Sequence, residues 1–94
     1  MKGIAILGST GSIGCNTLKV IEHLGEHRVV AMAAGRNMSL FAEQVARFQP
    51  DLVSCENEQC ADELREILRQ QNAPIPTIRT NDEGLNAVAD HPLA

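Results

Sequence analysis

Short apolar runs recur along the chain, and the first two are each closed by a glycine. The first two cover residues 4–7 and 29–34, are continuously apolar and are followed by Gly8 and Gly35. A weaker third run covers residues 52–55, and the segment 77–79, Thr-Ile-Arg, has the length of a short strand. An apolar run of this length is typical of a strand buried on both faces of a parallel sheet. The pattern therefore predicts buried strands at residues 4–7 and 29–34, a weaker third strand at 52–55 and a short fourth strand at 77–79.

Segments with helical periodicity follow each of the four runs. Gly25 predicts the end of the first helix and Pro50 the end of the second. Ser39, Asn57 and Asn81 are predicted to cap the second, third and fourth helices, because their side chains accept hydrogen bonds from a first turn. The side chains expected to face inward are Ile13, Thr17, Val20, Ile21 and Leu24 in the first helix, Phe41, Val45 and Phe48 in the second, Ala61, Leu64, Ile67 and Leu68 in the third, and Leu85, Val88 and Ala89 in the fourth.

Four strand–helix units in succession predict an α/β fold with a parallel sheet, right-handed connections and helices on both faces. We expect the strand order 4-3-2-1. The arrangement is Rossmann-like but incomplete, since it holds only about four such units.

Composition and charge narrow the classes of partner. The net charge is −4, and Phe41 and Phe48 are the only aromatic residues, so nucleic acid is not expected as a partner. The three cysteines, Cys15, Cys55 and Cys60, show no paired spacing, which favours a reducing compartment and predicts a cytoplasmic location. Nothing approaches the roughly 20 apolar residues of a membrane span, so no membrane partner is expected.

The most informative segment follows the first predicted strand and opens the first predicted helix. It reads Gly8-Ser9-Thr10-Gly11-Ser12-Ile13-Gly14, with the spacing G-x-x-G-x-x-G. Glycines permit a tight turn and close approach of a pyrophosphate, and the N–H groups of the helix start then face the anion. A positive φ is considered at Gly11. We predict nucleotide binding here; the alternative is a tight turn without a ligand.

The end of the second predicted strand indicates which nucleotide binds. NAD-binding domains usually place a carboxylate about 20 residues after the turn, where it holds the ribose 2′-hydroxyl. This chain reads Ala33-Ala34-Gly35-Arg36-Asn37 in that region, so we expect an arginine and no carboxylate. A guanidinium pairs with a 2′-phosphate through charge-assisted hydrogen bonds. The segment therefore predicts NADP, with a solvated loop arginine as the alternative.

No metal site and no catalytic residue are predicted within the chain. His23 and His27 are four residues apart, but Gly25 lies between them and is expected to end the helix. Cys15 is interpreted as a packed residue of the first helix.

Residues 6–14 and 34–37 together resemble the 1-deoxy-D-xylulose 5-phosphate reductoisomerase family. The resemblance covers the whole chain and is strongest up to residue 37. It implies that residues 1–94 are the N-terminal part of an NADP-binding Rossmann domain, with the catalytic and C-terminal domains absent from this chain.

The resemblance also implies roles for individual residues. Those that would contact the phosphates of NADPH and adjoining groups are Thr10, Gly11, Ser12 and Ile13. Those that would hold the adenosine ribose and its 2′-phosphate are Gly35, Arg36 and Asn37. The family often has lysine where this chain has Arg36, so the charge is kept.

The activity that the resemblance implies is oxidation of NADPH coupled to rearrangement of a phosphosugar. The family's enzymes convert 1-deoxy-D-xylulose 5-phosphate to 2-C-methyl-D-erythritol 4-phosphate in non-mevalonate isoprenoid biosynthesis, and they need Mg²⁺ or Mn²⁺. The metal ligands would lie downstream of Ala94, so the 94-residue chain alone is expected to be inactive. A homodimer is implied for the full-length enzyme.

Two alternatives stay open at this point. One is a stand-alone NADP-binding module without catalysis. The other is a different NADP-dependent reductase with a G-x-x-G-x-x-G turn, of the aspartate-semialdehyde or epimerase type. An epimerase-type site would need a Tyr-x-x-x-Lys pair, and the chain has no tyrosine.

Overall fold

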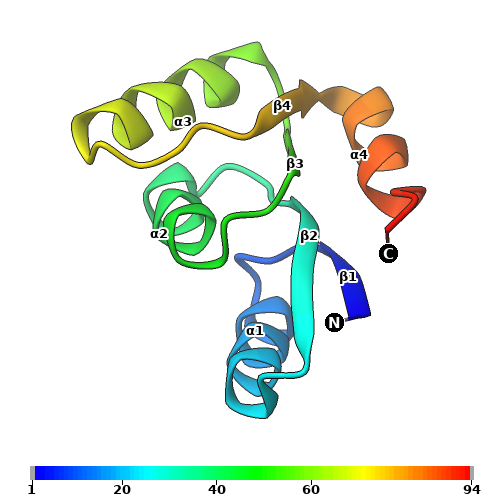
Figure 1. Ribbon diagram of the computed structural model, residues 1–94. Coiled ribbons are helices and arrows are strands. Elements are labelled where there is room, and N and C mark those ends of the chain that lie inside the picture. The colour runs from blue at the N-terminus through cyan, green and yellow to red at the C-terminus, as the bar shows by residue number, and fades with distance from the viewer. Residues whose placement is uncertain (1, 94) are drawn as a thin grey trace.

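Strands and helices alternate four times in the computed structural model, which describes residues 2–93 apart from the side chain of Lys2 (Figure 1). The elements are β1 (Lys2–Leu7), α1 (Ser12–Leu24), β2 (His27–Ala33), α2 (Met38–Phe48), β3 (Leu52–Cys55), α3 (Glu58–Gln70), β4 (Thr77–Thr80) and α4 (Asn81–Ala89). The predicted α/β fold is confirmed. No helix within residues 2–93 is both long and apolar enough to cross a membrane.

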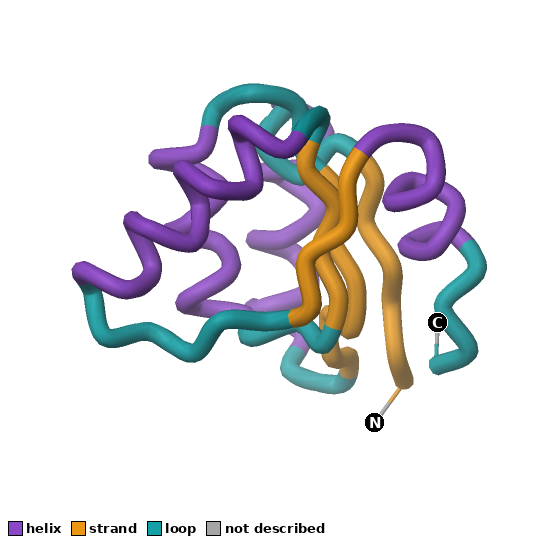
Figure 2. Tube along the Cα trace, turned by 90° about the horizontal axis from the view of Figure 1, so that it is seen from above, coloured by secondary structure: helices purple, strands orange, loops and turns teal. Residues whose placement is uncertain are grey.

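All four strands form one parallel sheet in the order β1-β2-β3-β4, which is the predicted order. Helices α1, α2 and α3 cover one face of this sheet, and α4 lies alone against the other (Figure 2). Strand β2 lies inside the sheet, so each residue from Val29 to Ala33 is buried. Burial on both faces explains why this strand is apolar without alternation.

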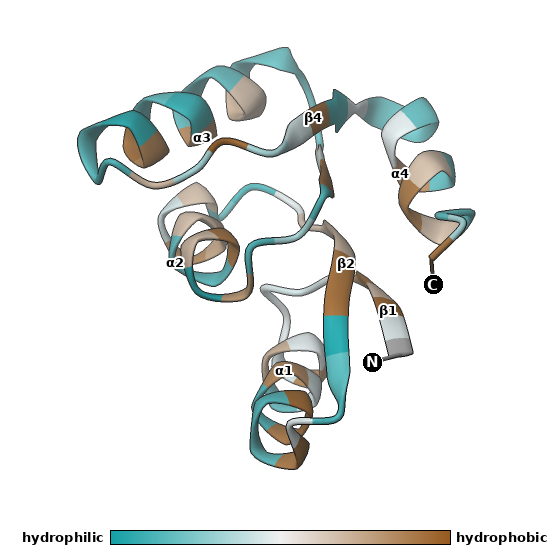
Figure 3. Ribbon diagram, viewed as in Figure 1, coloured by the Kyte–Doolittle hydropathy of each residue, from teal (hydrophilic) through white to brown (hydrophobic). Residues whose placement is uncertain are grey.

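The larger core lies between the sheet and the three helices on one face. Met32, Phe41, Leu64 and Leu68 are fully buried there. Strand β2 is hydrophobic, drawn brown, beyond its hydrophilic beginning (Figure 3). The opposite core is small, with Ala31, Ala33 and Val88 at its centre. Small side chains on this face allow α4 to pack close to the strands.

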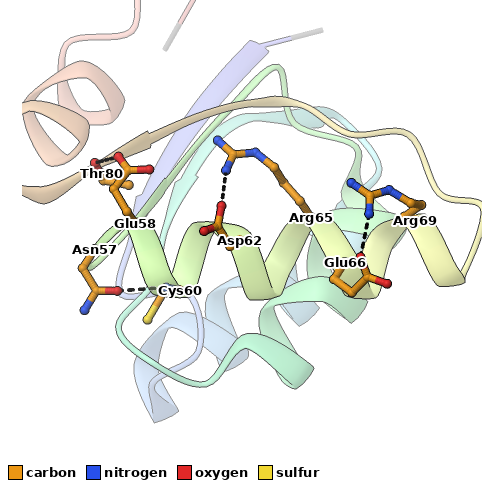
Figure 4. Close-up of polar contacts among 8 residues, drawn as sticks. All are labelled: Asn57, Glu58, Cys60, Asp62, Arg65, Glu66, Arg69 and Thr80. Carbon is orange, nitrogen blue, oxygen red and sulfur yellow. Dashed lines mark hydrogen bonds and ion pairs between the residues drawn. The ribbon is translucent and has the colours of Figure 1, made fainter.

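Several predicted helix boundaries are confirmed. Gly25 ends α1 in the left-handed conformation, with φ 69°. Asn57 caps α3, because its side chain accepts a hydrogen bond of 2.8 Å from the N–H of Cys60 (Figure 4). Arg65 and Arg69 pair with acidic neighbours on the exposed side of the same helix, which is therefore a solvated surface.

The caps of two other helices were predicted at the wrong residues. Asn37, not Ser39, caps α2, since its Oδ1 accepts from the N–H of Leu40 at 3.2 Å. The helix begins earlier than expected because Met38 is buried in the core. Helix α4 is preceded by Thr80, and Asn81 is its first residue, with φ 59°.

The inward faces of α1 and α4 were predicted only in part, since Ile21 and Val88 are buried as expected but their predicted neighbours are not. Ile13 is 84% exposed, and Val20 and Leu24 are also exposed. The buried residues of α1 are Gly14, Leu18 and Ile21, and those of α4 are Gly84 and Val88, whereas Thr17, Leu85 and Ala89 are exposed. In both helices a glycine lies on the inward face, where a side chain would not fit. Gly14 lies against the turn that follows β1, and Gly84 lies against β3 and β4. Periodicity of large apolar residues does not detect such a face.

The space at Gly14 leads to a stability prediction. A Cβ there would lie 2.2 Å from the carbonyl oxygen of Gly8 and 2.8 Å from Cα of Ser9. Gly14→Ala should therefore destabilise the protein by about 1–3 kcal/mol, as overpacking does, despite the better helix propensity of alanine. Urea denaturation measures the change. Gly35→Ala, where no atom lies within 4 Å, is the control and should be nearly neutral. Equal stability of the Gly14→Ala variant and the parent would contradict the packing argument.

Candidate nucleotide-binding site

The glycine turn between β1 and α1 is fastened to the end of β2. The N–H groups of Gly8 and Ser9 both donate to the carbonyl oxygen of Ala33, at 2.8 and 3.0 Å, and the N–H of Gly11 donates to Gly8 at 3.1 Å. Gly8 has φ 74°, so the positive φ occurs here. The positive φ considered at Gly11 is wrong, because its φ is −77°. The chain reverses direction directly at the strand end, not in the middle of the turn.

The start of α1 has unpaired donors that face solvent. Gly11 is the residue before the helix, and it provides no side chain to cap the first turn. The exposed residues are Gly11, Ser12 and Ile13, and Thr10 is half-buried. N–H groups of a first turn lack partners within the helix and carry the positive end of the helix dipole. This arrangement suits an anion such as a phosphate.

A buried glutamine from α2 supports the turn from behind. Nε2 of Gln44 donates to the carbonyl oxygen of Ser9 at 2.8 Å, and Sγ of Cys15 lies 3.5 Å from the same oxygen. Gln44 is only 7% exposed. Sequence reasoning missed it, although a polar residue on the stripe of Phe41 and Val45 was a visible signal. Cys15 was predicted to be packed, and it is half-buried.

A pocket of ≈ 430 Å³ opens at the carboxyl ends of the strands. Its lining consists of Gly8, Ala33, Ala34, Gly35, Cys55 and Glu56, with Asn81, Asp82 and Leu85 from the start of α4. Burial raises the pKa of the Cys55 thiol to about 11, so this lining residue is neutral at physiological pH. Small side chains along the floor leave room for a planar ring, and polar groups lie at the rim.

The exposed side chain of Arg36 is paired with a carboxylate. Its Nε and Nη2 donate to the two carboxylate oxygens of Glu56, at 2.6 and 3.3 Å. These hydrogen bonds and the charge of Glu56 raise the pKa of Arg36 above its ordinary value, so it stays a cation. The segment at the end of β2 supplies no carboxylate, as expected, but the end of β3 brings one to it, which was not predicted from the sequence. Glu56 follows β3, and the pairing of β2 with β3 brings it beside Arg36, 20 residues away in the chain.

The seven residues named from the sequence fall into two groups. Gly35 lines the pocket, and Arg36 and Asn37 directly follow it. Asn37 also caps α2 through Oδ1, which leaves its amide nitrogen for other contacts. Residues 10–13 form the end of the turn and the start of α1, outside the pocket lining.

Metal-binding side chains do not gather in the described part of the chain. Among residues 2–93, no group of three or more His, Cys, Asp or Glu residues could hold a metal ion. His23 lies at the exposed end of α1 and His27 begins β2, so Gly25 separates them as predicted.

Comparisons with known proteins identify relatives of the whole chain. The model of the family described as 1-deoxy-D-xylulose 5-phosphate reductoisomerase matches residues 4–94. The enzyme of that name from Symbiobacterium thermophilum is 50% identical over 93 residues, covering 97% of this chain and 24% of its own length. The chloroplastic enzyme from Oryza sativa subsp. japonica is 47% identical over 94 residues, covering 99% of this chain and 20% of its own length. The chain thus spans about a fifth to a quarter of these relatives.

Solved structures with the same fold carry the same name. A DOX-P reductoisomerase in complex with NADPH, fosmidomycin and magnesium has a TM-score of 0.85 and 26% identity, over 98% of this chain and 22% of that one. The Zymomonas mobilis enzyme in complex with NADPH has a TM-score of 0.80 and 27% identity, over 94% of this chain and 23% of that one. Since the family model matches nearly every residue, this chain belongs to the 1-deoxy-D-xylulose 5-phosphate reductoisomerase family.

Proposed function

We propose that this chain is the NADPH-binding part of an enzyme that rearranges and reduces 1-deoxy-D-xylulose 5-phosphate to 2-C-methyl-D-erythritol 4-phosphate. The observation that carries the proposal is the position of the glycine turn. It joins β1 to an uncapped helix start, next to a pocket at the carboxyl ends of the strands. Dinucleotides bind at this location in open α/β sheets. Family membership favours this enzyme over another reductase with the same glycine spacing.

Each group of residues would bind a different part of the cofactor. The N–H groups after Gly11, with the hydroxyls of Thr10 and Ser12, would bind the pyrophosphate. Gly35 and Asn37 would contact the ribose, and Arg36 would pair with its 2′-phosphate. When bound, NADPH would supply the hydride for the reduction. The residues of this chain bind and orient the cofactor.

The remaining requirements of the reaction would be met outside the described residues. We propose that the intact protein binds Mg²⁺ or Mn²⁺ and the phosphosugar through other residues, because residues 2–93 hold no cluster of metal ligands. A cytoplasmic location and a homodimer are also proposed for the intact protein. Cell fractionation and light scattering would test these two proposals.

The phosphate turn should control the affinity for the cofactor. Gly11→Val places a branched side chain where the pyrophosphate would approach. The φ of −77° and a nearest atom at 3.4 Å from the new Cβ both permit the fold to form. We expect NADPH affinity to fall at least about tenfold, because the side chain would keep the phosphate from the N–H groups that follow Gly11, and loss of one hydrogen bond to a charged group has about this effect. Fluorescence titration measures the affinity, and circular dichroism should match the parent. Unchanged affinity would show that the turn is only structural.

The choice of cofactor depends on Arg36. The intact protein should bind NADPH more tightly than NADH, and Arg36→Ala should remove most of that difference, about tenfold, because the 2′-phosphate loses its cation. Isothermal titration with both cofactors measures the preference. Arg28→Ala removes a similar exposed arginine at the start of β2 and serves as the control. Equal affinity of the parent for both cofactors would contradict the NADP assignment.

Catalysis should need more than this chain. A polypeptide restricted to residues 1–94 should not oxidise NADPH in the presence of 1-deoxy-D-xylulose 5-phosphate and Mg²⁺, because it lacks a metal cluster among residues 2–93. The intact protein should do so under the same conditions. Absorbance of NADPH gives the rate. Measurable turnover by the 94-residue polypeptide would contradict this division of roles.

A further inference from the structure

The ion pair between Arg36 and Glu56 lies at the rim of the proposed nucleotide pocket. Both carboxylate oxygens accept from one edge of the guanidinium, formed by Nε and Nη2. Glu56 also lines the pocket itself. The carboxylate that engages the arginine is therefore next to the space that a ribose would enter.

Carboxylate and phosphate groups use the same features of a guanidinium. Each presents two oxygens at a spacing that fits a pair of parallel N–H donors. The edge of Arg36 that engages Glu56 is thus an edge that could engage a 2′-phosphate. Asp82 adds a second carboxylate to the pocket lining, so Glu56 and Asp82 both place negative charge in the pocket.

We propose that Glu56 is a specificity-determining residue that competes with the 2′-phosphate of NADPH for Arg36. This inference rests on the proposed function. Binding of NADPH exchanges one anionic partner of Arg36 for another. The loss of the ion pair with Glu56 therefore offsets part of the free energy gained from the contact between Arg36 and the phosphate. NADH has no 2′-phosphate and makes no such exchange. Glu56 therefore narrows the preference for NADPH over NADH.

Exposure of the pair limits the size of the effect. The side chains of Arg36 and Glu56 are 79% and 42% exposed. Exposed ion pairs contribute little to stability because water and salt screen them. Replacing Glu56 by the phosphate on Arg36 therefore costs little free energy. Removing the competitor should change affinity by about two- to fivefold, the range that the loss of an exposed pair produces.

The test compares Glu56→Gln with the parent in the intact protein by titration with NADPH and with NADH. We expect Glu56→Gln to bind NADPH about two- to fivefold more tightly, without a gain for NADH. Asp51→Asn is the matched control. Asp51 pairs with Arg28 at 2.8 and 3.2 Å, and it precedes β3 whereas Glu56 follows it. This control removes the same charge from a similar pair at the opposite end of the strand and should alter neither affinity.

The Arg36→Ala background separates competition from simple repulsion. In that background, Glu56→Gln should give less than half of the gain in NADPH affinity that it gives in the parent, because no guanidinium remains to be released from Glu56. Unchanged or weaker NADPH binding by Glu56→Gln in the parent background would overturn the inference, as would a full gain without Arg36. The parent titrations test the proposed function separately: if the parent shows no preference for NADPH, that function fails first.

Discussion

The close approach of α1 to the end of β1 is the constraint on which the site depends. A side chain at Gly14 would collide with the backbone of Gly8 and Ser9, at 2.2 and 2.8 Å. The helix start is therefore held against the turn, and Gly14, Leu18 and Ile21 become its inner face. Gln44 then fixes the same turn from α2 through the carbonyl oxygen of Ser9. The uncapped donors of the first turn are consequently presented by a rigid support.

Much of the fold could be predicted from the sequence because buried parallel strands leave a simple signal. The apolar run of β2 follows from its burial on both faces, and the end of α1 at Gly25 follows from the left-handed backbone conformation there. The faces of α1 and α4 could not be found in the same way, since Gly14 and Gly84 contribute nothing to an apolar pattern. A Cβ at Gly84 would lie 2.2 Å from Oγ of Ser54, which only the packed structure reveals.

The candidate site was predicted in its local parts but not in its contacts between strands. The turn and Arg36 are contiguous in sequence with their strands, so spacing was enough to identify them. Glu56 reaches Arg36 only because β2 and β3 are neighbours, and periodicity along one segment does not report such pairs. The charges at a strand end therefore have to be counted across adjacent strands before a cofactor is assigned.

The position of α4 on the second face determines where a further strand could join the sheet. Helices α1 to α3 lie on one face while the chain moves from β1 to β4, and α4 crosses the other face toward β1 (Figure 2). The segment after α4 then lies against β1, since the carbonyl oxygen of Leu93 would be only 1.9 Å from a Cβ at Gly3. A right-handed connection through α4 can place a further parallel strand only beyond β1. Gly8 would then lie between two halves of a continuous sheet rather than at its margin. The glycine turn would open into a crevice with walls on both sides.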